Sequence, residues 1–367
     1  MVVRKLIYIS TINLVLNKAQ SMQVIKFVKS LHKISSYEEV FFKAFSLSQV
    51  PSKYNNYFEV LNKRYTGNRL NNNIIMIFYL LKNSLIDSED FIFSRDLFIV
   101  FIFAILGHKT IYEYHHPAPF LNSIIFKLYN LLPNTRLVTI SKALKFHFLK
   151  NNNWYTKKVL VLHSAVEIEN YENLPNKKEC RDELGMSDNY YYIIHTGAPY
   201  EGRGIEKFVQ LCKFSRDIFF IHIGGGNSDL ERLKKLAKES NINNCLFLPS
   251  IEEEEIIKYQ KAADLLFYII TEKWPTFWCC SPLKLPEYMA SGTPILASGI
   301  GSITEMINKK NSFLYDINDK SLCNSLLKAK SNPTLASKIA ISAKLEAESR
   351  FTLDLRSKLL IKYLRKF

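Results

Sequence analysis

The stretch Ser281-Pro-Leu-Lys-Leu-Pro-Glu-Tyr-Met-Ala-Ser-Gly-Thr-Pro294 decides the fold of this chain. It begins with a Ser-Pro turn, continues as a short apolar helix that carries Lys284 and Glu287, and ends at Gly-Thr-Pro. Apolar runs of strand length, 263–270 and 294–298, stand before and after it. Strand, helix and strand in this order indicate a βαβ unit, in which the two strands are parallel.

The same alternation extends along the rest of the chain. The apolar runs of strand length are 4–10, 39–43, 90–94, 110–114, 136–140, 191–196, 217–223, 245–248, 264–270 and 294–298. Strands that alternate with helical patterns predict two doubly wound α/β domains with parallel sheets. We place these Rossmann-like domains at 1–170 and 171–350, with a charged linker at 167–187 and a closing amphipathic helix at 351–367. Because ligands bind at the carboxyl ends of parallel strands, we expect both sets of loops to face one cleft.

Charge is distributed unevenly along the 367 residues. The net charge is +15; residues 1–150 carry 19 Lys and Arg against 8 Asp and Glu, and residues 151–367 carry 30 against 26. A basic N-terminal half is typical of a protein with an anionic partner, such as an anionic membrane surface or a lipid pyrophosphate. Lysines that are only solvated are the alternative. The charge is scattered and no nucleic-acid-binding module is visible, so we expect no nucleic-acid partner.

The cysteines and the apolar runs bear on the compartment. Six cysteines without Cys-x-x-Cys spacing predict the reduced thiols of a cytoplasmic protein. The first residues lead into a strand without the cleavage site of a signal peptide. The longest apolar run, 97–106, has about half of the roughly 20 residues that a membrane-spanning helix needs, so we predict a buried helix.

Three loops that follow strands carry the candidate donor-site residues. The helix after Ser281 presents free N–H groups and a positive dipole end, which suit a phosphate. We expect Glu287 nearly two turns into this helix, where it can accept hydrogen bonds from ribose hydroxyls. In Gly197-Ala-Pro-Tyr-Glu-Gly-Arg203-Gly204, Gly197 allows close approach and Arg203 can donate twice to a phosphate. The Gly224-Gly225-Gly226 turn fails the dinucleotide-binding fingerprint and suits a close-approach loop.

These residues resemble the nucleotide-sugar site of the retaining glycosyltransferases called family 4, which have the two-domain GT-B fold. In that family a Glu-x7-Glu helix places its second glutamate on the ribose, and the turn before it binds the diphosphate. Glu287 matches the second glutamate, and the run Ser281, Pro282, Leu283, Lys284 matches the turn. Cys279 stands where the family has its first glutamate.

The resemblance also covers the two glycine-containing loops. In the family a Gly-Arg-x-x-x-x-Lys-Gly loop neutralises the departing diphosphate; Gly197 and Arg203 match it, and Ala198 replaces the other arginine. Lys284 can substitute for that missing cation. Gly224 and Gly225 resemble a family turn that lines the nucleotide pocket. An arginine in an ordinary surface loop and a purely structural glycine turn are the alternatives.

In the N-terminal domain the run Tyr112-Glu113-Tyr-His115-His116-Pro117 follows a predicted strand. The resemblance implies a histidine near the reacting sugar and the acceptor. His115 matches it, with His116 as the alternate and Glu113 beside them; surface histidines that cap a loop are the alternative. Glu305 matches a family glutamate near the donor, or is a solvated helix residue.

Taken together, the resemblance implies a retaining glycosyltransferase that uses a UDP- or GDP-linked sugar and needs neither cofactor nor metal. Its acceptor would be a lipid-linked glycan in capsule, O-antigen or lipopolysaccharide synthesis, with the enzyme cytoplasmic or peripheral on the inner membrane face. A non-catalytic nucleotide-sugar-binding paralogue, or a partner of another transferase, is the main alternative, prompted by Cys279 and Ala198. A nucleotide-sugar epimerase on the same fold is a third reading, against which the Ser-Pro-x-Lys-x-x-Glu helix argues.

Overall fold

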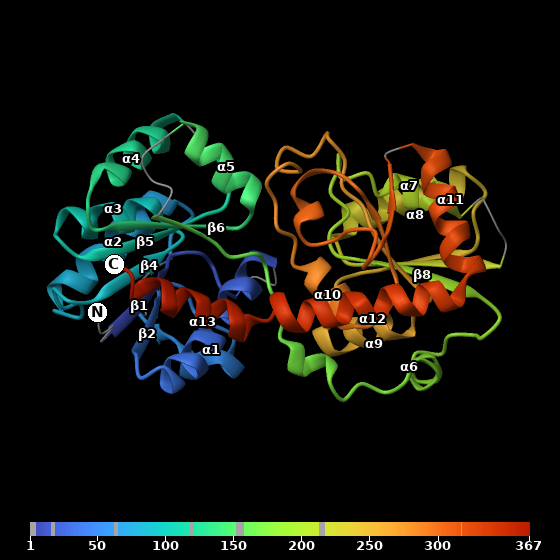
Figure 1. The fold of residues 1–367 in the computed structure, drawn as a ribbon, viewed down its shortest axis with the longest axis horizontal. Coiled ribbons are helices and arrows are strands. Elements are labelled where there is room, and N and C mark those ends of the chain that lie inside the picture. The colour runs from blue at the N-terminus through green and yellow to red at the C-terminus, as the bar shows by residue number, and fades with distance from the viewer. Residues whose placement is uncertain are drawn as a thin grey trace. The chain divides into compact units, whose positions relative to one another are not determined.

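The chain folds into two compact α/β units (Figure 1). The computed structural model describes residues 5–15, 19–61, 65–117, 120–151, 158–212, 217–316 and 318–367. The first unit combines the described part of 1–163 with 353–367, and the second unit comprises 164–352. Each unit contains one parallel sheet.

The first unit has a seven-stranded parallel sheet in the order β3-β2-β1-β4-β5-β6-β7. Its strands are β1 (Lys5–Ser10), β2 (Phe41–Ser46), β3 (Glu59–Val60), β4 (Phe91–Ser94), β5 (Lys109–Tyr114), β6 (Thr135–Thr139) and β7 (Val159–Val161). The central strands are buried on both faces; Leu6, Ile7, Tyr8 and Ile9 of β1 are all at most 1% exposed. Near-continuous apolar strands of this kind are expected where helices cover both faces of a parallel sheet.

Helices cover both faces of this sheet. They are α1 (Ala19–Tyr37), η1 (Ser52–Tyr57), α2 (Arg69–Lys82), α3 (Leu97–Ile105), α4 (Phe120–Leu131), α5 (Lys142–Asn151) and α13 (Leu353–Leu364). Right-handed crossovers place α1 on one face and α2, α3, α4 and α5 on the other, and α13 packs on α1 (Figure 1). The predicted buried helix at 97–106 is confirmed as α3. Among the described residues, no helix has both the length and the apolar character that a membrane span requires.

The second unit has a six-stranded parallel sheet in the order β10-β9-β8-β11-β12-β13. Its strands are β8 (Tyr191–Thr196), β9 (Ile218–Ile223), β10 (Cys245–Leu248), β11 (Leu265–Tyr268), β12 (Ile295–Ser298) and β13 (Phe313–Tyr315). Its helices are η3 (Ile168–Tyr171), α6 (Lys177–Glu183), α7 (Glu206–Leu211), α8 (Asn227–Glu239), α9 (Glu253–Ala262), α10 (Lys284–Ala290), η4 (Gly301–Glu305), α11 (Asp319–Ser331) and α12 (Pro333–Arg350).

The strand order of each sheet reverses at one point, which lies between β1 and β4 in the first unit and between β8 and β11 in the second. This is the strand order of the Rossmann fold, in which ligands bind outside the carboxyl ends of the strands at the reversal. The predicted pair of doubly wound parallel sheets is therefore confirmed. The reversal points direct attention to the loops that follow β8, β9 and β11 in the second unit, and β4 and β5 in the first.

Three local predictions were wrong. The strand predicted at 39–43 is β2, which begins at Phe41, because Glu39 has a φ of +55° in the turn after α1. The linker predicted at 167–187 is part of the second unit, where Arg181 donates to Asp264 at 2.7 Å. Glu287 lies in the first turn of α10, not almost two turns along it, because the helix begins at Lys284.

Candidate functional site

The loops after β8 and β9 touch each other through glycine. The Gly197 N–H donates to the Ile223 carbonyl at 2.6 Å, and the Gly224 N–H donates to the Leu248 carbonyl at 3.0 Å. A Cβ on Gly224 would lie 3.0 Å from Gly197 backbone atoms, and both glycines have positive φ. A Cβ on Gly225 would lie 2.5 Å from Pro199. Side chains at these positions would push the two loops apart, so glycine is required for the close approach.

Lys284 lies directly over Gly197. A Cβ on Gly197 would come within 2.2 Å of the Lys284 Nζ atom, so the ammonium group occupies the space above that glycine. Burial and the nearby charge of Arg203 lower the pKa of Lys284 to about 7, and Glu287 opposes this shift. A buried lysine with a lowered pKa is suited to an anionic ligand, because the negative charge of the ligand would favour the protonated form of the lysine.

Arg203 lies close to two aromatic rings. Its guanidinium carbon lies 4.5 Å from the ring centroid of Trp274 and 5.4 Å from that of Tyr200. The two rings stack on each other, 5.9 Å apart and within 6° of parallel. The Arg203 Nε atom is buried and has no partner among the described residues. Cation–π contacts with the two rings thus position the guanidinium group, and its Nε donor is unpaired among the described residues.

Two buried histidines near the ends of β8 and β9 form hydrogen bonds that reach the Gly224 turn. The Nδ1 atoms of His195 and His222 are 3.0 Å apart, and His222 Nε2 lies 2.9 Å from the Gly224 carbonyl. Because that carbonyl only accepts, Nε2 of His222 carries the proton, and His195 Nδ1 must donate to His222 Nδ1. Burial lowers the pKa of His222 to about 4 and that of His195 well below its usual value, so both rings are neutral. The pair connects β8 to the Gly224 turn.

The turn before α10 is fixed by hydrogen bonds between main-chain groups and side-chain hydroxyls. The Ser164 N–H donates to Ser281 Oγ at 2.8 Å, and Ser164 Oγ donates to the Ser281 carbonyl at 2.5 Å. The Thr196 N–H donates to the Tyr288 hydroxyl at 2.8 Å, which ties α10 to the end of β8. Pro282 and Leu283 complete the turn between Ser281 and α10 and are half-buried. Ser281 therefore positions the turn through its hydroxyl.

Cys279 occupies the position at which the related family has its first glutamate. Its side chain is fully buried, and burial raises the pKa of its thiol to about 12, so the group is neutral. Glu287 is half-buried on α10 and its charge opposes the lowering of the Lys284 pKa; burial, with the charge of Glu287, raises the pKa of Tyr171. Glu305 ends η4, and its carbonyl accepts from Arg350 at 3.4 Å.

In the first unit Glu113 is an interior carboxylate. Its carboxylate accepts hydrogen bonds from Arg95 Nε at 2.7 Å and from Arg356 Nη2, and its side chain is fully buried. Burial alone would raise the pKa of Glu113, but Arg95, His115 and Arg356 together hold it well below the usual value. Arg356 comes from α13 and also donates to the carbonyls of Leu162 and His163. Glu113 thus binds protein arginines and presents no surface to a ligand.

His115 borders this ion cluster. Its Nε2 atom lies 3.3 Å from Glu113 Oε1, and about a quarter of its side chain is exposed. Burial and the charge of Arg95 lower the pKa of His115 to about 4, so the ring is neutral. With the Nε2 proton toward the carboxylate, Nδ1 is left as an acceptor. His116 is exposed, and its Nδ1 lies 3.1 Å from the Pro117 carbonyl.

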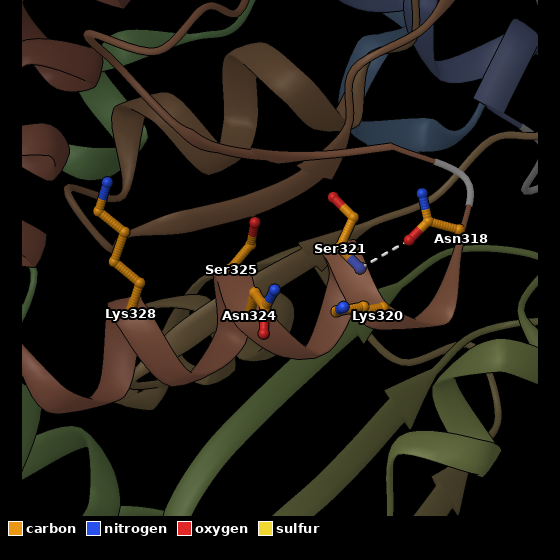
Figure 2. A pocket seen from close by; sticks show the side chains of 6 residues that line it. All are labelled: Asn318, Lys320, Ser321, Asn324, Ser325 and Lys328. Atoms are coloured by element: carbon orange, nitrogen blue, oxygen red, sulfur yellow. Dashed lines mark hydrogen bonds between the residues drawn. The ribbon is translucent and has the colours of Figure 1, made fainter.

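A surface hollow on α11 contains none of the residues described above. It is lined by Asn318, Lys320, Ser321, Asn324, Ser325 and Lys328 (Figure 2). Asn318 Oδ1 accepts from the Ser321 N–H at 2.7 Å and caps the helix, and Ser325 Oγ donates to the Leu314 carbonyl. None of the predicted site residues lines it. Among the described residues, no group of three or more His, Cys, Asp or Glu side chains forms a metal site.

Five residues of these clusters were not predicted: Arg95, Arg356, His195, His222 and Trp274. Only the histidines gave a signal. His195 and His222 are paired neighbours in register, each one residue before the end of its strand. Equivalent polar residues in two otherwise apolar strands indicate a buried contact at the carboxyl edge.

Comparison with known proteins finds a family match in the second unit. Residues 176–346 match the family described as "Glycosyl transferases group 1". An uncharacterised glycosyltransferase of Methanocaldococcus jannaschii is 29% identical over 136 residues, 36% of this chain and 34% of that protein. The alpha-galactosylglucosyldiacylglycerol synthase of Streptococcus pneumoniae is 25% identical over 146 residues, 38% of this chain and 37% of that protein. These matches thus span only about a third of the curated relatives' lengths.

The fold comparison covers both units. The crystal structure of Anabaena HepE in complex with UDP and glucose superposes with a TM-score of 0.77 at 16% identity, covering 99% of this chain and 100% of HepE. At this identity the likeness concerns the fold, and with two sheets in Rossmann order it confirms the GT-B class. The second unit is therefore similar to the glycosyl transferases group 1 family over residues 176–346.

Proposed function

We propose that this chain is a retaining glycosyltransferase of family 4 that uses a UDP- or GDP-linked sugar. One observation carries the proposal: Lys284 and Arg203 lie at the glycine loops after β8 and β9, at the carboxyl edge of the second sheet. Two cations beside glycine positions, where a ligand can approach the backbone closely, suit a diphosphate. HepE, which shares the fold, was crystallised with UDP and glucose.

The proposed chemistry follows from the charge that develops on the leaving group. The bond between the anomeric carbon and the diphosphate oxygen breaks, and the acceptor oxygen attacks the same face of the sugar. The acceptor proton passes to the departing diphosphate. Arg203 and Lys284 stabilise the negative charge as it forms, which is the largest contribution that a rigid site makes to catalysis. These cations do the work of a metal ion, so we propose that none is required.

Glu287 and His115 have separate proposed roles. Glu287, in the first turn of α10, accepts hydrogen bonds from the donor ribose. His115 is neutral and has a free acceptor nitrogen, which suits a hydroxyl of the acceptor or of the donor sugar. The acceptor is a glycan, and we propose a lipid-linked one in capsule, O-antigen or lipopolysaccharide synthesis. The relative in S. pneumoniae is named as a synthase of a glycosylated diacylglycerol.

A nucleotide screen tests the donor site. Purified protein is melted with UDP, GDP, ADP and CMP, as wild type and as Glu287→Ala and Arg203→Ala. A ligand at 100 times its Kd stabilises the folded state by about 2.7 kcal/mol, so we expect one nucleotide to raise the melting temperature of the wild type alone. Glu201→Ala, an exposed carboxylate of the same loop, is the matched control and should keep the shift. Absence of any shift in the wild type would overturn the proposal.

The low pKa of Lys284 predicts pH-dependent binding. A bound diphosphate favours the ammonium form, so binding takes up a proton when the free protein is above pH 7. Affinity is therefore complete below pH 7 and is lost as pH rises, by up to about tenfold per pH unit until the pKa of the complex is reached. Titration calorimetry in buffers of different ionisation heat should detect the uptake. A dissociation constant that does not change between pH 7 and about pH 8.5 would contradict this role.

A non-catalytic nucleotide-sugar-binding protein is the second candidate. The neutral thiol of Cys279 and the apolar side chain of Ala198 favour it, because both replace charged groups of the related family. Such a protein would show the nucleotide shift but would neither transfer nor hydrolyse the bound sugar. Incubation of the identified donor with the protein, followed by assay for free nucleoside diphosphate, separates the two candidates.

A further inference from the structure

Helix α2 is apolar on both of its sides. Met76, Ile77 and Leu80 are buried against the sheet. On the other side Ile74, Phe78 and the neighbouring Leu70 and Leu81 follow each other at intervals of three or four residues, and all are 46–66% exposed. A helix that is apolar all round requires something to cover its outer side.

Helix α4 repeats this pattern. Its Phe126 and Tyr129 are buried, whereas Ile124, Leu128 and Leu131 are about half exposed at the same helical spacing. Both α2 and α4 pack on α3, so their exposed stripes belong to one side of the first unit (Figure 1). Scattered exposed apolar residues are ordinary, but aligned stripes on neighbouring helices form a patch of the kind that marks an interaction site.

The helices on this side contain basic residues and no acidic ones, while the exposed carboxylates of Asp87 and Glu89 lie in the loop that follows α2. Helices α2, α3, α4 and α5 contain six Lys or Arg residues and no Asp or Glu. Across residues 97–163 there are eight Lys or Arg residues and a single acidic one, Glu113, which is buried against arginines. No surface carboxylate of these helices therefore offsets the lysines.

We propose that the outer sides of α2, α3, α4 and α5 form a docking surface for an anionic lipid bilayer. Apolar side chains enter the boundary between headgroups and acyl chains, while lysines around them bind anionic headgroups. Nucleic acid would use the lysines but not the apolar stripes. A second copy of the same surface would bring six basic residues against six. Only the bilayer suits both the apolar and the basic side chains.

The topology makes this docking compatible with ligand binding at the strand ends. In βαβ units the helices run opposite to the strands, so Leu81, Ile105 and Leu131, near the ends of their helices, lie at the amino edge of the sheet. Glu113 and His115 are at the carboxyl end of β5. Leu70, at the start of α2, lies at the carboxyl edge, whereas the other residues of the two stripes lie from the middle of their helices toward the amino edge. Most of the docking surface is therefore away from the carboxyl edge. The inference rests on side chains of the first unit and not on the donor site.

Vesicle flotation with the full chain tests the surface. Vesicles of phosphatidylcholine, and of phosphatidylcholine with 30% phosphatidylglycerol, are compared at about 0.1 M salt. The wild type should float with the anionic vesicles only. The triple variant Lys82→Glu, Lys127→Glu and Lys150→Glu changes exposed residues, and should bind about 100-fold more weakly because each lysine near an anionic surface contributes about a fivefold factor. Phe78→Ser should weaken binding about tenfold.

Controls separate docking from folding and from other partners. Leu345→Ser changes an equally exposed leucine of α12 in the second unit and should bind like the wild type. All variants should keep the nucleotide-induced melting shift, which makes loss of docking distinct from failure of the donor site. Wild type that does not float, or Phe78→Ser that floats unchanged, overturns the proposal. So does equal binding of duplex DNA, or a dimer in solution that Phe78→Ser dissociates.

Discussion

Replacing Lys284 with alanine will lower kcat for sugar transfer by about 10²–10³-fold, as the loss of one oxyanion donor does in other enzymes. The ammonium group sits over Gly197, where the family resemblance places the diphosphate. Its stabilising effect grows as the leaving group gains charge, so the loss falls on kcat more than on KM. Steady-state kinetics with the donor found by the nucleotide screen measure both constants.

Lys273→Ala is the matched control for this variant. Lys273 is an exposed lysine that follows β11, and its backbone lies near Gly202. We expect its kcat to change less than twofold, since an exposed charge beside the loop contributes little. A Lys284→Ala enzyme whose KM rises while kcat stays constant would assign Lys284 to ground-state binding and would contradict the proposed role in the transition state.

Glu113→Gln will destabilise the first unit by about 3–5 kcal/mol, because it leaves Arg95 and Arg356 buried without their carboxylate. The pair of arginines is only 4% exposed, and Arg95 Nη1 already lacks a partner among the described residues. Glutamine keeps the shape of the side chain, so the loss reports the charge. Urea unfolding followed by circular dichroism measures the free energy of unfolding.

The control for this prediction is a surface ion pair in the same sheet. Glu59 and Lys43 are 3.7 Å apart and almost half exposed, so Glu59→Gln should cost less than about 1 kcal/mol. The depressed pKa of Glu113 also fixes the sign of the pH effect. Its contribution is complete above the pKa of an unfolded glutamate and is lost as pH falls through the lower folded value. Equal costs for the two variants would contradict a buried ion cluster.

The fold was predictable because its signals are local. Apolar runs of strand length between helical patterns place β1, β4, β5, β8 and β12 within one residue of their predicted bounds. The failures have physical causes. The composition of 167–187 is charged, but Asn176 and Glu179 form a capping box that starts α6, and Arg181 anchors that helix to Asp264. Charge content alone does not distinguish such a surface helix from a linker.

The candidate site was predictable in part. The motif at Ser281–Glu287 and the loop at Gly197–Arg203 identified the carboxyl edge of the second sheet, and the structure places Lys284 over Gly197 as a close pair. The roles assigned to these residues stay predictions. The contact between Arg203 and Trp274 joins loops whose residues are 71 positions apart in the sequence. No local pattern connects Glu113 with Arg356, because tertiary contacts alone bring them together.

The position of α13 has a consequence for how the chain is made. Arg356 completes the ion cluster around Glu113, and Asp354 accepts from Ser30 on α1 at 3.0 Å, so residues 353–367 are structural parts of the first unit. A ribosome delivers residues 164–352 before it delivers these. The second unit therefore has its full sequence while the first still lacks a helix, and an elongating chain holds Glu113 and Arg95 beside an incomplete interior. Synthesis from the amino terminus thus finishes the later unit first, and the earlier one last.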